Sequence, residues 1–141
     1  MDSLYSLGFL LNRASFSLDK MLRVELKRNN LELPHSQFIV LRCLYYKDGL
    51  NQQEIATLLC KDAAAIKRTI DNLEDRGLVS RVHVSQRENS IRITEDGKNL
   101  MPLALKCGDL ALDKVLKDIE TDDYELLKQL LHRIYLNAEQ T

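Results

Sequence analysis

One stretch of the sequence decides the fold: residues 51–93 read NQQEIATLLCKDAAAIKRTIDNLEDRGLVSRVHVSQRENSIRI. The stretch opens with a capping-box pattern, in which Asn51 is a favourable N-cap residue and Glu54 stands three positions later. The apolar residues that follow are spaced as on a short helix. We expect this helix to end in a tight turn at Cys60 and Lys61, where the helical spacing is interrupted.

A second helix and a hairpin complete this stretch. Asp62 is expected to cap a helix that runs to Arg76 and is stopped by Gly77. Beyond Gly77 the apolar period changes from about 3.6 residues to about 2. The alternating apolar residues of the two runs are Val82, Val84, Ile91 and Ile93. The polar residues 85–89 lie between the runs, so the pattern predicts a β-hairpin with these residues as its loop.

The order helix, turn, helix and hairpin is that of a winged helix-turn-helix. In this fold a short helix supports a second helix that can lie in the major groove of DNA. Two positions fit the packing of the helix pair, because Ala56 is small where the second helix crosses and Ile66 can fill the space between them. Cys60 stands where a glycine often supplies left-handed backbone, so we expect mild strain or an altered turn there.

The two ends of the chain predict long helices. Residues 4–29 carry an apolar stripe at alternating spacings of three and four, which is a heptad pattern. It indicates either a core helix or a helix that is also used for dimerisation. Thr94 is expected to cap a second long helix with Pro102 near its start, and Thr121 to cap the last helix. The last helix has a similar stripe: Tyr124, Leu127, Leu131 and Ile134.

Composition limits the class of protein. The 141 residues suit one domain, and only two prolines and five glycines favour a mainly α-helical fold. The sequence shows neither a signal-peptide pattern nor an apolar run of the roughly 18 residues that a membrane span needs. We therefore expect a cytoplasmic protein without a membrane partner. Three widely spaced cysteines and three scattered histidines predict neither a disulfide framework nor a metal site.

The second helix of the stretch carries candidate DNA-binding residues. On a helical wheel Ala64 and Arg68 lie away from the apolar face, with Ala65 and Lys67 on its flanks. The two basic side chains can donate to guanine or to phosphates, and the small alanines allow contact with thymine methyl groups. An ordinary amphipathic surface helix is the alternative interpretation. Asp71 and Asp75 lie further along, where they would repel phosphates, and Asp71 could instead pair with an arginine of the hairpin.

The hairpin carries a second set of basic residues. The net charge of the chain is −1, but residues 76–92 contain four arginines and one acid. Arg87 lies in the hairpin loop, where it could enter the minor groove or simply remain solvated. Arg81 and Arg92 flank it on the predicted strands. This modest basic patch is compatible with DNA binding even though the chain as a whole is slightly acidic.

Residues 33–97 resemble the multiple antibiotic resistance regulator (MarR) family. Four segments in order carry the resemblance: LPHSQFIVL (33–41), LNQQEIATLL (50–59), IDNLEDRGLV (70–79) and IRITEDGKNL (91–100). The resemblance implies a bacterial-type regulator that binds pseudo-palindromic double-stranded DNA as a homodimer. By position, Asp62 to Arg68 match the family's base-reading stretch, and Arg87 matches its wing-tip arginine. The wing of the family often has two adjacent arginines, whereas this chain has one.

The resemblance also implies that different parts of a single domain, residues 1–141, have different roles. Residues 1–33 and 98–141 would form the dimerisation helices, and residues 34–97 the DNA-binding lobe. Many members of the family release DNA when a small phenolic or anionic molecule binds near the junction of these parts. The candidate ligand-binding residues near that junction are Arg13, His35, Tyr45 and Tyr46.

Alternative functions remain open on the sequence alone. Cys60 precedes the predicted reading helix, so its oxidation could control DNA affinity in a thiol-based redox-sensing regulator. A winged helix can also serve as a protein-interaction module, because a fold does not determine a function. An enzyme is disfavoured and no cofactor is expected, since the sequence shows no nucleophile–base constellation, no Gly-rich phosphate loop and no metal-ligand cluster. The sequence leaves open whether a regulator of this kind represses or activates.

Overall fold

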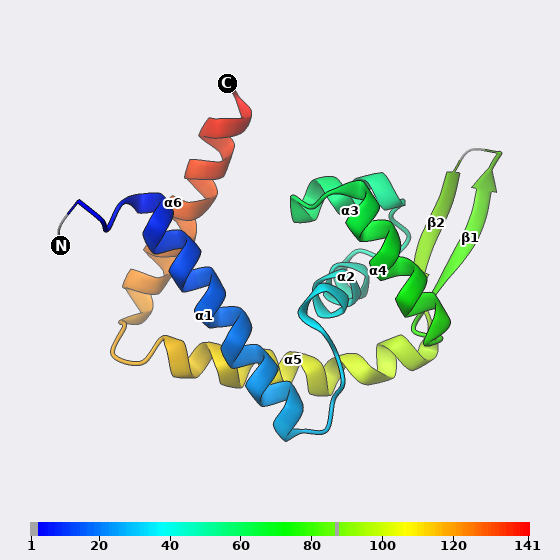
Figure 1. Ribbon diagram of the computed structural model, residues 1–141, viewed down its shortest axis with the longest axis horizontal. Helices are drawn as coiled ribbons and strands as arrows, with labels where there is room; N and C mark the ends of the chain where they lie inside the picture. The colour runs from blue at the N-terminus through cyan, green and yellow to red at the C-terminus, as the bar shows by residue number, and fades with distance from the viewer. Residues whose placement is uncertain (1–2, 87) are drawn as a thin grey trace.

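The computed structural model describes residues 3–86 and 88–141. These residues form six helices and one two-stranded antiparallel sheet, which confirms the predicted mainly α-helical winged helix-turn-helix (Figure 1). The elements are α1 (Leu7–Arg28), α2 (His35–Tyr46), α3 (Gln52–Leu59), α4 (Ala63–Asp75), β1 (Val79–Ser85), β2 (Glu88–Ile93), α5 (Glu95–Val115) and α6 (Thr121–Glu139). Helices α2 to α4 and the hairpin form one lobe, while α5 leads from the base of the hairpin to α6 (Figure 1).

The helix-turn-helix pair forms as the sequence predicts. The capping box is present in both directions, because the Asn51 side chain accepts from the Glu54 N–H and the Glu54 carboxylate accepts from the Asn51 N–H. Cys60 ends α3 in the left-handed conformation, with φ of 53°. This left-handed conformation is energetically less favourable for a residue with a Cβ than for glycine. Asp62 occupies the N-cap position of α4, but its side chain accepts no capping hydrogen bond from any described residue, contrary to expectation.

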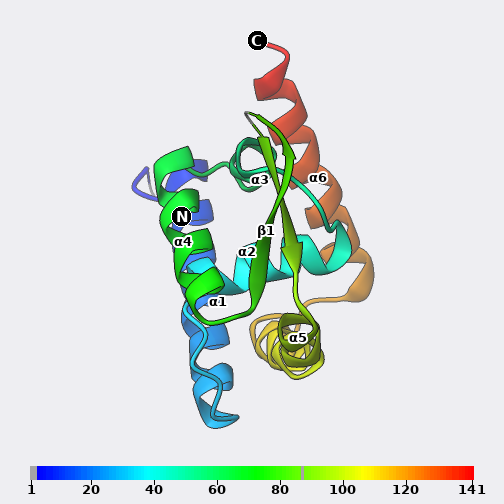
Figure 2. The ribbon, with the colours of Figure 1, turned by 90° about the vertical axis from the view of Figure 1, so that its right-hand side faces the viewer.

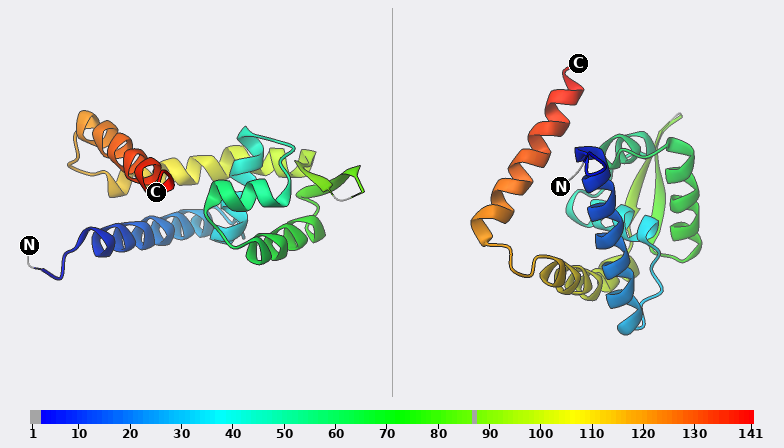
Figure 3. Two further views of the ribbon diagram at one scale, coloured as in Figure 1. Left: turned by 90° about the horizontal axis from the view of Figure 1, so that it is seen from above. Right: turned by 60° about the vertical axis from the view of Figure 1, so that its left-hand side comes forward.

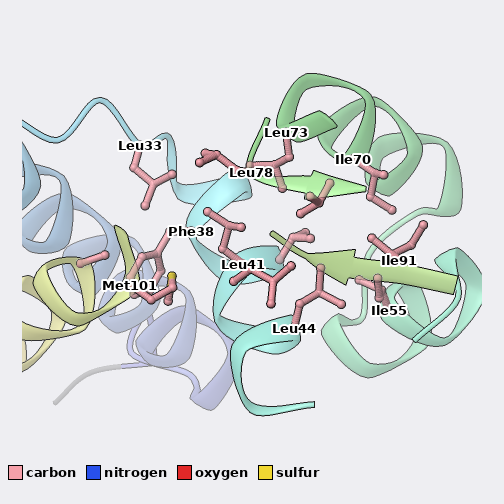
Figure 4. Packing of buried hydrophobic residues seen from close by; sticks show 14 of the residues in the cluster. Leu33, Phe38, Leu41, Leu44, Ile55, Ile70, Leu73, Leu78, Ile91 and Met101 are labelled. Atoms are coloured by element: carbon pink, nitrogen blue, oxygen red, sulfur yellow. The ribbon is translucent and has the colours of Figure 1, made fainter. Parts of the chain in front are cut away.

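The core is one buried cluster that extends from the meeting point of α2, α3, α4 and the hairpin to α1 and α5 (Figure 4). Ile66 and Ala56 are buried at the contact between α3 and α4, as their predicted roles require. The apolar face of α4 is completed by Ile70 and Leu73, both fully buried. Figure 4 shows side chains from α2, α3, α4, β2 and the residue just before β1 converging in this part of the core, among them Leu41, Leu44, Ile55, Ile70, Leu73, Leu78 and Ile91.

The hairpin is longer than the sequence predicted. Residues 85–89 were expected to form its loop, but β1 continues to Ser85 and β2 already begins at Glu88. The two residues are paired in the ladder, beyond an irregularity in register between His83 and Ser85. Backbone pairing thus overrides the polar character of this segment, because an exposed hairpin can carry polar side chains on both faces.

A loop between α2 and α3 holds the hairpin to the lobe. The Ile91 N–H donates to the Leu50 carbonyl at 2.8 Å, and the Gly49 N–H donates to the Ile91 carbonyl at 3.0 Å. The Asp48 carboxylate accepts from the Ile93 N–H at 2.9 Å, next to these bonds. The base of the hairpin is therefore fixed to the end of α2, while its tip extends away from the lobe (Figures 1 and 2).

Helix α5 starts directly at the base of the hairpin. Thr94 caps it as predicted, since its Oγ1 accepts from the Gly97 N–H at 3.1 Å. The same hydroxyl donates to the Gly77 carbonyl at 2.7 Å, so the cap also ties the helix to the end of α4. The helix continues through Pro102 without a break.

Helix α1 packs against α5 through a short apolar face and a buried ion pair. Leu22 and Leu26 are buried at this contact. Glu25 is also buried, and its carboxylate forms an ion pair with Lys114 of α5. The hydrogen bond from Lys114 lowers the pKa of Glu25 below its ordinary value, although burial acts in the opposite direction. The remaining apolar stripe of α1 is largely exposed, so the core-helix interpretation accounts for only part of this helix.

Helix α6 projects from the end of α5 and buries none of its side chains within the described chain (Figures 1 and 3). It begins with Glu120 rather than Thr121 at the N-cap, so the predicted cap is one residue out. Its apolar side chains are exposed by between 37% and 52%: Leu126, Leu127, Leu130, Leu131, Ile134 and Tyr135. Among the described residues, no helix combines the length and the apolar character that crossing a membrane requires.

Candidate DNA interface and effector cavity

One face of α4 presents the candidate base-contacting residues. Ala64, Lys67 and Arg68 are exposed, and Ala65 is half-buried. Arg68 forms no ion pair or hydrogen bond with any residue that the structure describes, so its five N–H donors can reach an external acceptor. Helix α4 and the hairpin lie side by side on the face seen in Figure 2, which is the arrangement needed to contact adjacent grooves of DNA.

An acidic pair on α4 binds the hairpin through Arg81. The Arg81 guanidinium lies 2.5 Å from Asp71 and 2.7 Å from Glu74, and its side chain is only 21% exposed. This confirms the predicted pairing of Asp71 with a hairpin arginine. Asp71 also pairs with Lys67 at 3.0 Å. The hydrogen bonds from Lys67 and then from Arg81 hold the pKa of Asp71 below its ordinary value. We call these four residues the Arg81 network.

The Arg81 network changes what we expect of Arg81 in DNA binding. Because two carboxylates already neutralise its guanidinium, we expect Arg81 to orient the hairpin against α4 rather than to neutralise a phosphate. Replacing Arg81 with methionine should weaken DNA binding several-fold but leave the slope of log K against log salt unchanged. If Arg81 instead contacts a phosphate, the magnitude of that slope should fall by about 0.9 for each copy of Arg81 in the complex. Binding titrations at several salt concentrations distinguish the two roles.

Few other basic groups lie on the described part of the hairpin. Arg87, the predicted wing-tip arginine, lies outside the described residues. Arg92 is exposed on β2, 4.0 Å from Asp48. Val82 and Val84 are exposed on β1, although apolar residues at alternating positions predicted a buried side. Their exposure follows from the projection of the hairpin beyond the core, so only Ile91 and Ile93 of the four alternating residues are buried.

A cavity of about 500 Å³ lies where α1, α2, α5 and α6 approach one another. This volume is in the range of about 300–1,000 Å³ that is usual for small-molecule sites. Its wall combines aromatic and apolar residues with charged ones. The aromatic residues are Phe38, Tyr46 and Tyr124, and the charged or titratable residues are Asp19, His35, Arg42 and Asp109.

The cavity includes two of the four predicted ligand-binding residues. His35 and Tyr46 line it. Arg13 does not, because its guanidinium lies over the rings of Tyr5 and Phe9 at 5.8 and 5.1 Å from their centres. Tyr45 does not line it either. Sequence reasoning missed Asp19, Arg42, Asp109 and Tyr124, which come from four different helices and have no common motif.

The three cysteines differ in their surroundings. Cys60 is exposed at the turn between α3 and α4, whereas Cys43 is half-buried and Cys107 is buried. Burial raises the pKa of the Cys43 and Cys107 thiols, which makes both less reactive. Redox control through Cys60 stays a prediction, and Cys60 is the one cysteine with the access that it requires.

Comparisons with known proteins agree with this architecture. The model of the MarR family matches residues 33–87. The chain is 27% identical over 125 residues to the uncharacterized HTH-type transcriptional regulator YybA of Bacillus subtilis, an alignment that covers 87% of this chain and 82% of YybA.

Two solved structures extend the likeness over nearly the whole chain. CouR from Rhodococcus jostii RHA1, bound to p-coumaroyl-CoA, is 27% identical with a TM-score of 0.82, covering 92% of this chain and 91% of CouR. A MarR family regulator from Listeria monocytogenes, complexed with 26mer DNA, is 27% identical with a TM-score of 0.80, covering 97% of this chain and 89% of that one.

The fold and the exposed face of α4 define a winged helix-turn-helix protein of the kind that regulates transcription. Residues 33–87 match the MarR family of transcriptional regulators, and the relatives of known structure are similar over nearly the whole chain, in agreement with the resemblance in its sequence.

Proposed function

We propose that the protein is a sequence-specific repressor that binds a pseudo-palindromic operator as a homodimer. The observation that carries this proposal is the exposed N-terminal half of α4, where Arg68 has no partner among the described residues and Ala64 allows close approach. Base reading by Asp62, Ala64, Ala65, Lys67 and Arg68 is part of the proposal. The Listeria monocytogenes relative in complex with DNA supports it by analogy.

The unpaired apolar surface supports the homodimer. The exposed leucines of α6 and the exposed stripe of α1, with Leu7 and Leu18, form more apolar surface than a stable monomer usually presents. A second copy of the chain would cover both surfaces around a two-fold axis, and each α4 would then meet one half-site. In this proposal residues 1–33 and 98–141 dimerise, and residues 34–97 form the DNA-binding lobe.

We further propose that a small molecule in the cavity releases the protein from DNA. The cavity lies between α5 and α6 on one side and α2 on the other, so a ligand there would contact both the dimerisation helices and the DNA-binding lobe. CouR, which is bound to p-coumaroyl-CoA, supports a ligand-responsive role by analogy.

The test of DNA reading is the variant Arg68→Ala. Selection of sites from random DNA would first supply the operator. If Arg68 donates to a base edge, we expect the variant to lose about 1–3 kcal/mol of binding and to lose its preference at that base pair. Fluorescence anisotropy with matched and mismatched duplexes measures both effects.

The control for this experiment is Lys98→Ala, which removes an exposed cation of α5 outside the proposed interface. An equal loss of affinity for all sequences in Arg68→Ala would limit Arg68 to phosphate contact. Failure of the unmodified protein to bind any selected duplex at low salt would contradict the regulator proposal itself.

A further inference from the structure

The wall of the cavity between α1, α2, α5 and α6 carries more carboxylates than guanidinium groups, which is unusual for a site that binds an anionic ligand. Two carboxylates, those of Asp19 and Asp109, line it together with one guanidinium, that of Arg42. Arg42 and Asp109 are exposed, whereas Asp19 is half-buried. Acids therefore outnumber permanent cations in the wall.

His35 lies beside Asp19 in the wall of the cavity. Its Nε2 lies 3.3 Å from the Asp19 carboxylate, and its Nδ1 is buried without a hydrogen-bond partner among the described residues. An N–H at Nδ1 would be a buried donor without an acceptor, which is costly.

Three aromatic side chains contribute to the apolar part of the wall. Phe38 and Tyr46 line the cavity from α2 and Tyr124 lines it from α6; Phe38 is buried, and Tyr46 is 69% exposed. Aromatic faces attract organic cations through their quadrupole, and more strongly where water is partly excluded. Carboxylates beside aromatic rings are thus the combination that recognises an ammonium group attached to an apolar body.

We propose that this cavity binds an aromatic amine or a related organic cation, with its ammonium group at Asp19 and Asp109 and its ring among Phe38, Tyr46 and Tyr124. This inference rests on the proposed effector role of the cavity and specifies the chemical class of the effector. It replaces the expectation of an anionic effector, for which Arg42 alone offers a permanent positive charge. The effector then enters as a cation, and the two acids select against carboxylates of the same shape.

The experiment compares two probes with the same phenol ring and nearly the same length. Tyramine carries an ammonium group, and 3-(4-hydroxyphenyl)propionate carries a carboxylate. Isothermal titration of the full chain without DNA at neutral pH should show tyramine binding about tenfold or more tightly, a ratio that one favourable charge interaction in a partly buried site can supply. Equal or tighter binding of the carboxylate, or no binding of tyramine at millimolar concentration, would overturn the inference.

The variant Asp109→Asn locates the ammonium group. It keeps the shape of an exposed side chain, so we expect a folded protein that binds tyramine about tenfold less tightly but binds neutral 4-ethylphenol as before. Asp113→Asn is the matched control, since Asp113 lies one turn further along α5 and does not line the cavity. Unchanged tyramine affinity in Asp109→Asn would overturn the assignment.

DNA binding is measured separately on the same preparations, so that the proposed ligand class and the proposed DNA-binding function are tested independently of each other. Intact DNA binding without any preference for the amine overturns the ligand class alone. Amine binding without DNA binding overturns the proposed function and leaves the cation site standing.

Discussion

Replacing Gly97 with alanine should destabilise the protein by an amount at or above the upper end of the about 1–3 kcal/mol that overpacking usually costs. A Cβ at this position would lie 2.3 Å from the Leu78 carbonyl oxygen and 2.7 Å from the Ile93 side chain. The Leu78 carbonyl cannot move away easily, because it accepts the Thr94 N–H at 3.1 Å. The start of α5 would have to separate from the base of the hairpin, which would disturb the lobe that presents α4.

A second glycine of α5 provides the control for this prediction. A Cβ at Gly108 would find its nearest neighbour, the Phe38 ring, at 3.7 Å, which is ordinary contact. Gly108→Ala should therefore be neutral or stabilising, by up to about 1 kcal/mol from helix propensity. Urea denaturation followed by circular dichroism compares the two variants directly. Equal stability of Gly97→Ala and the unmodified chain would show that α5 does not pack tightly against the hairpin.

The parts of the fold that sequence predicts best are set by neighbouring residues. The capping box at Asn51 and the cap at Thr94 involve partners three positions apart, so their patterns are visible in the chain. The turn at Cys60 was located correctly for the same reason, although it lacks the usual glycine. Apolar periodicity likewise identified the buried face of α4, because a helix presents every third or fourth residue to the core.

The parts that sequence predicts poorly depend on contacts between distant segments. The cavity brings together Asp19, Arg42, Asp109 and Tyr124 from four helices, and no spacing rule relates them. Strand length was also underestimated, because residues such as Asn89 pair across the hairpin whatever their polarity. Arg81 is an intermediate case. Its pairing with Asp71 was anticipated from charge, but its second bond to Glu74 emerged only from the geometry.

The exposed apolar face of α6 leads to a second prediction, in which substitutions on this face have a large effect on dimerisation and DNA affinity. The double variant Leu127→Asp and Leu131→Asp places two carboxylates on this exposed face, which has no covering element within the described chain. If a second copy covers the face, burying two unpaired charges at that interface should dissociate the dimer. Sedimentation at micromolar concentration should then show a monomer. A monomer contacts only one half-site, so DNA affinity should fall by at least about 100-fold.

The matched control adds the same two acids to the opposite side of the same helix. Gln129→Asp with His132→Asp changes exposed polar residues that lie away from the leucines on a helical wheel, and it gives the same formal charge as the leucine variant. We expect this control to remain a dimer and to bind DNA with a moderate loss from added repulsion. A dimer of unchanged affinity in the leucine variant would contradict the role of α6 in dimerisation. Because neither leucine is buried in its own protomer, the leucine variant should stay folded, which separates loss of assembly from loss of structure.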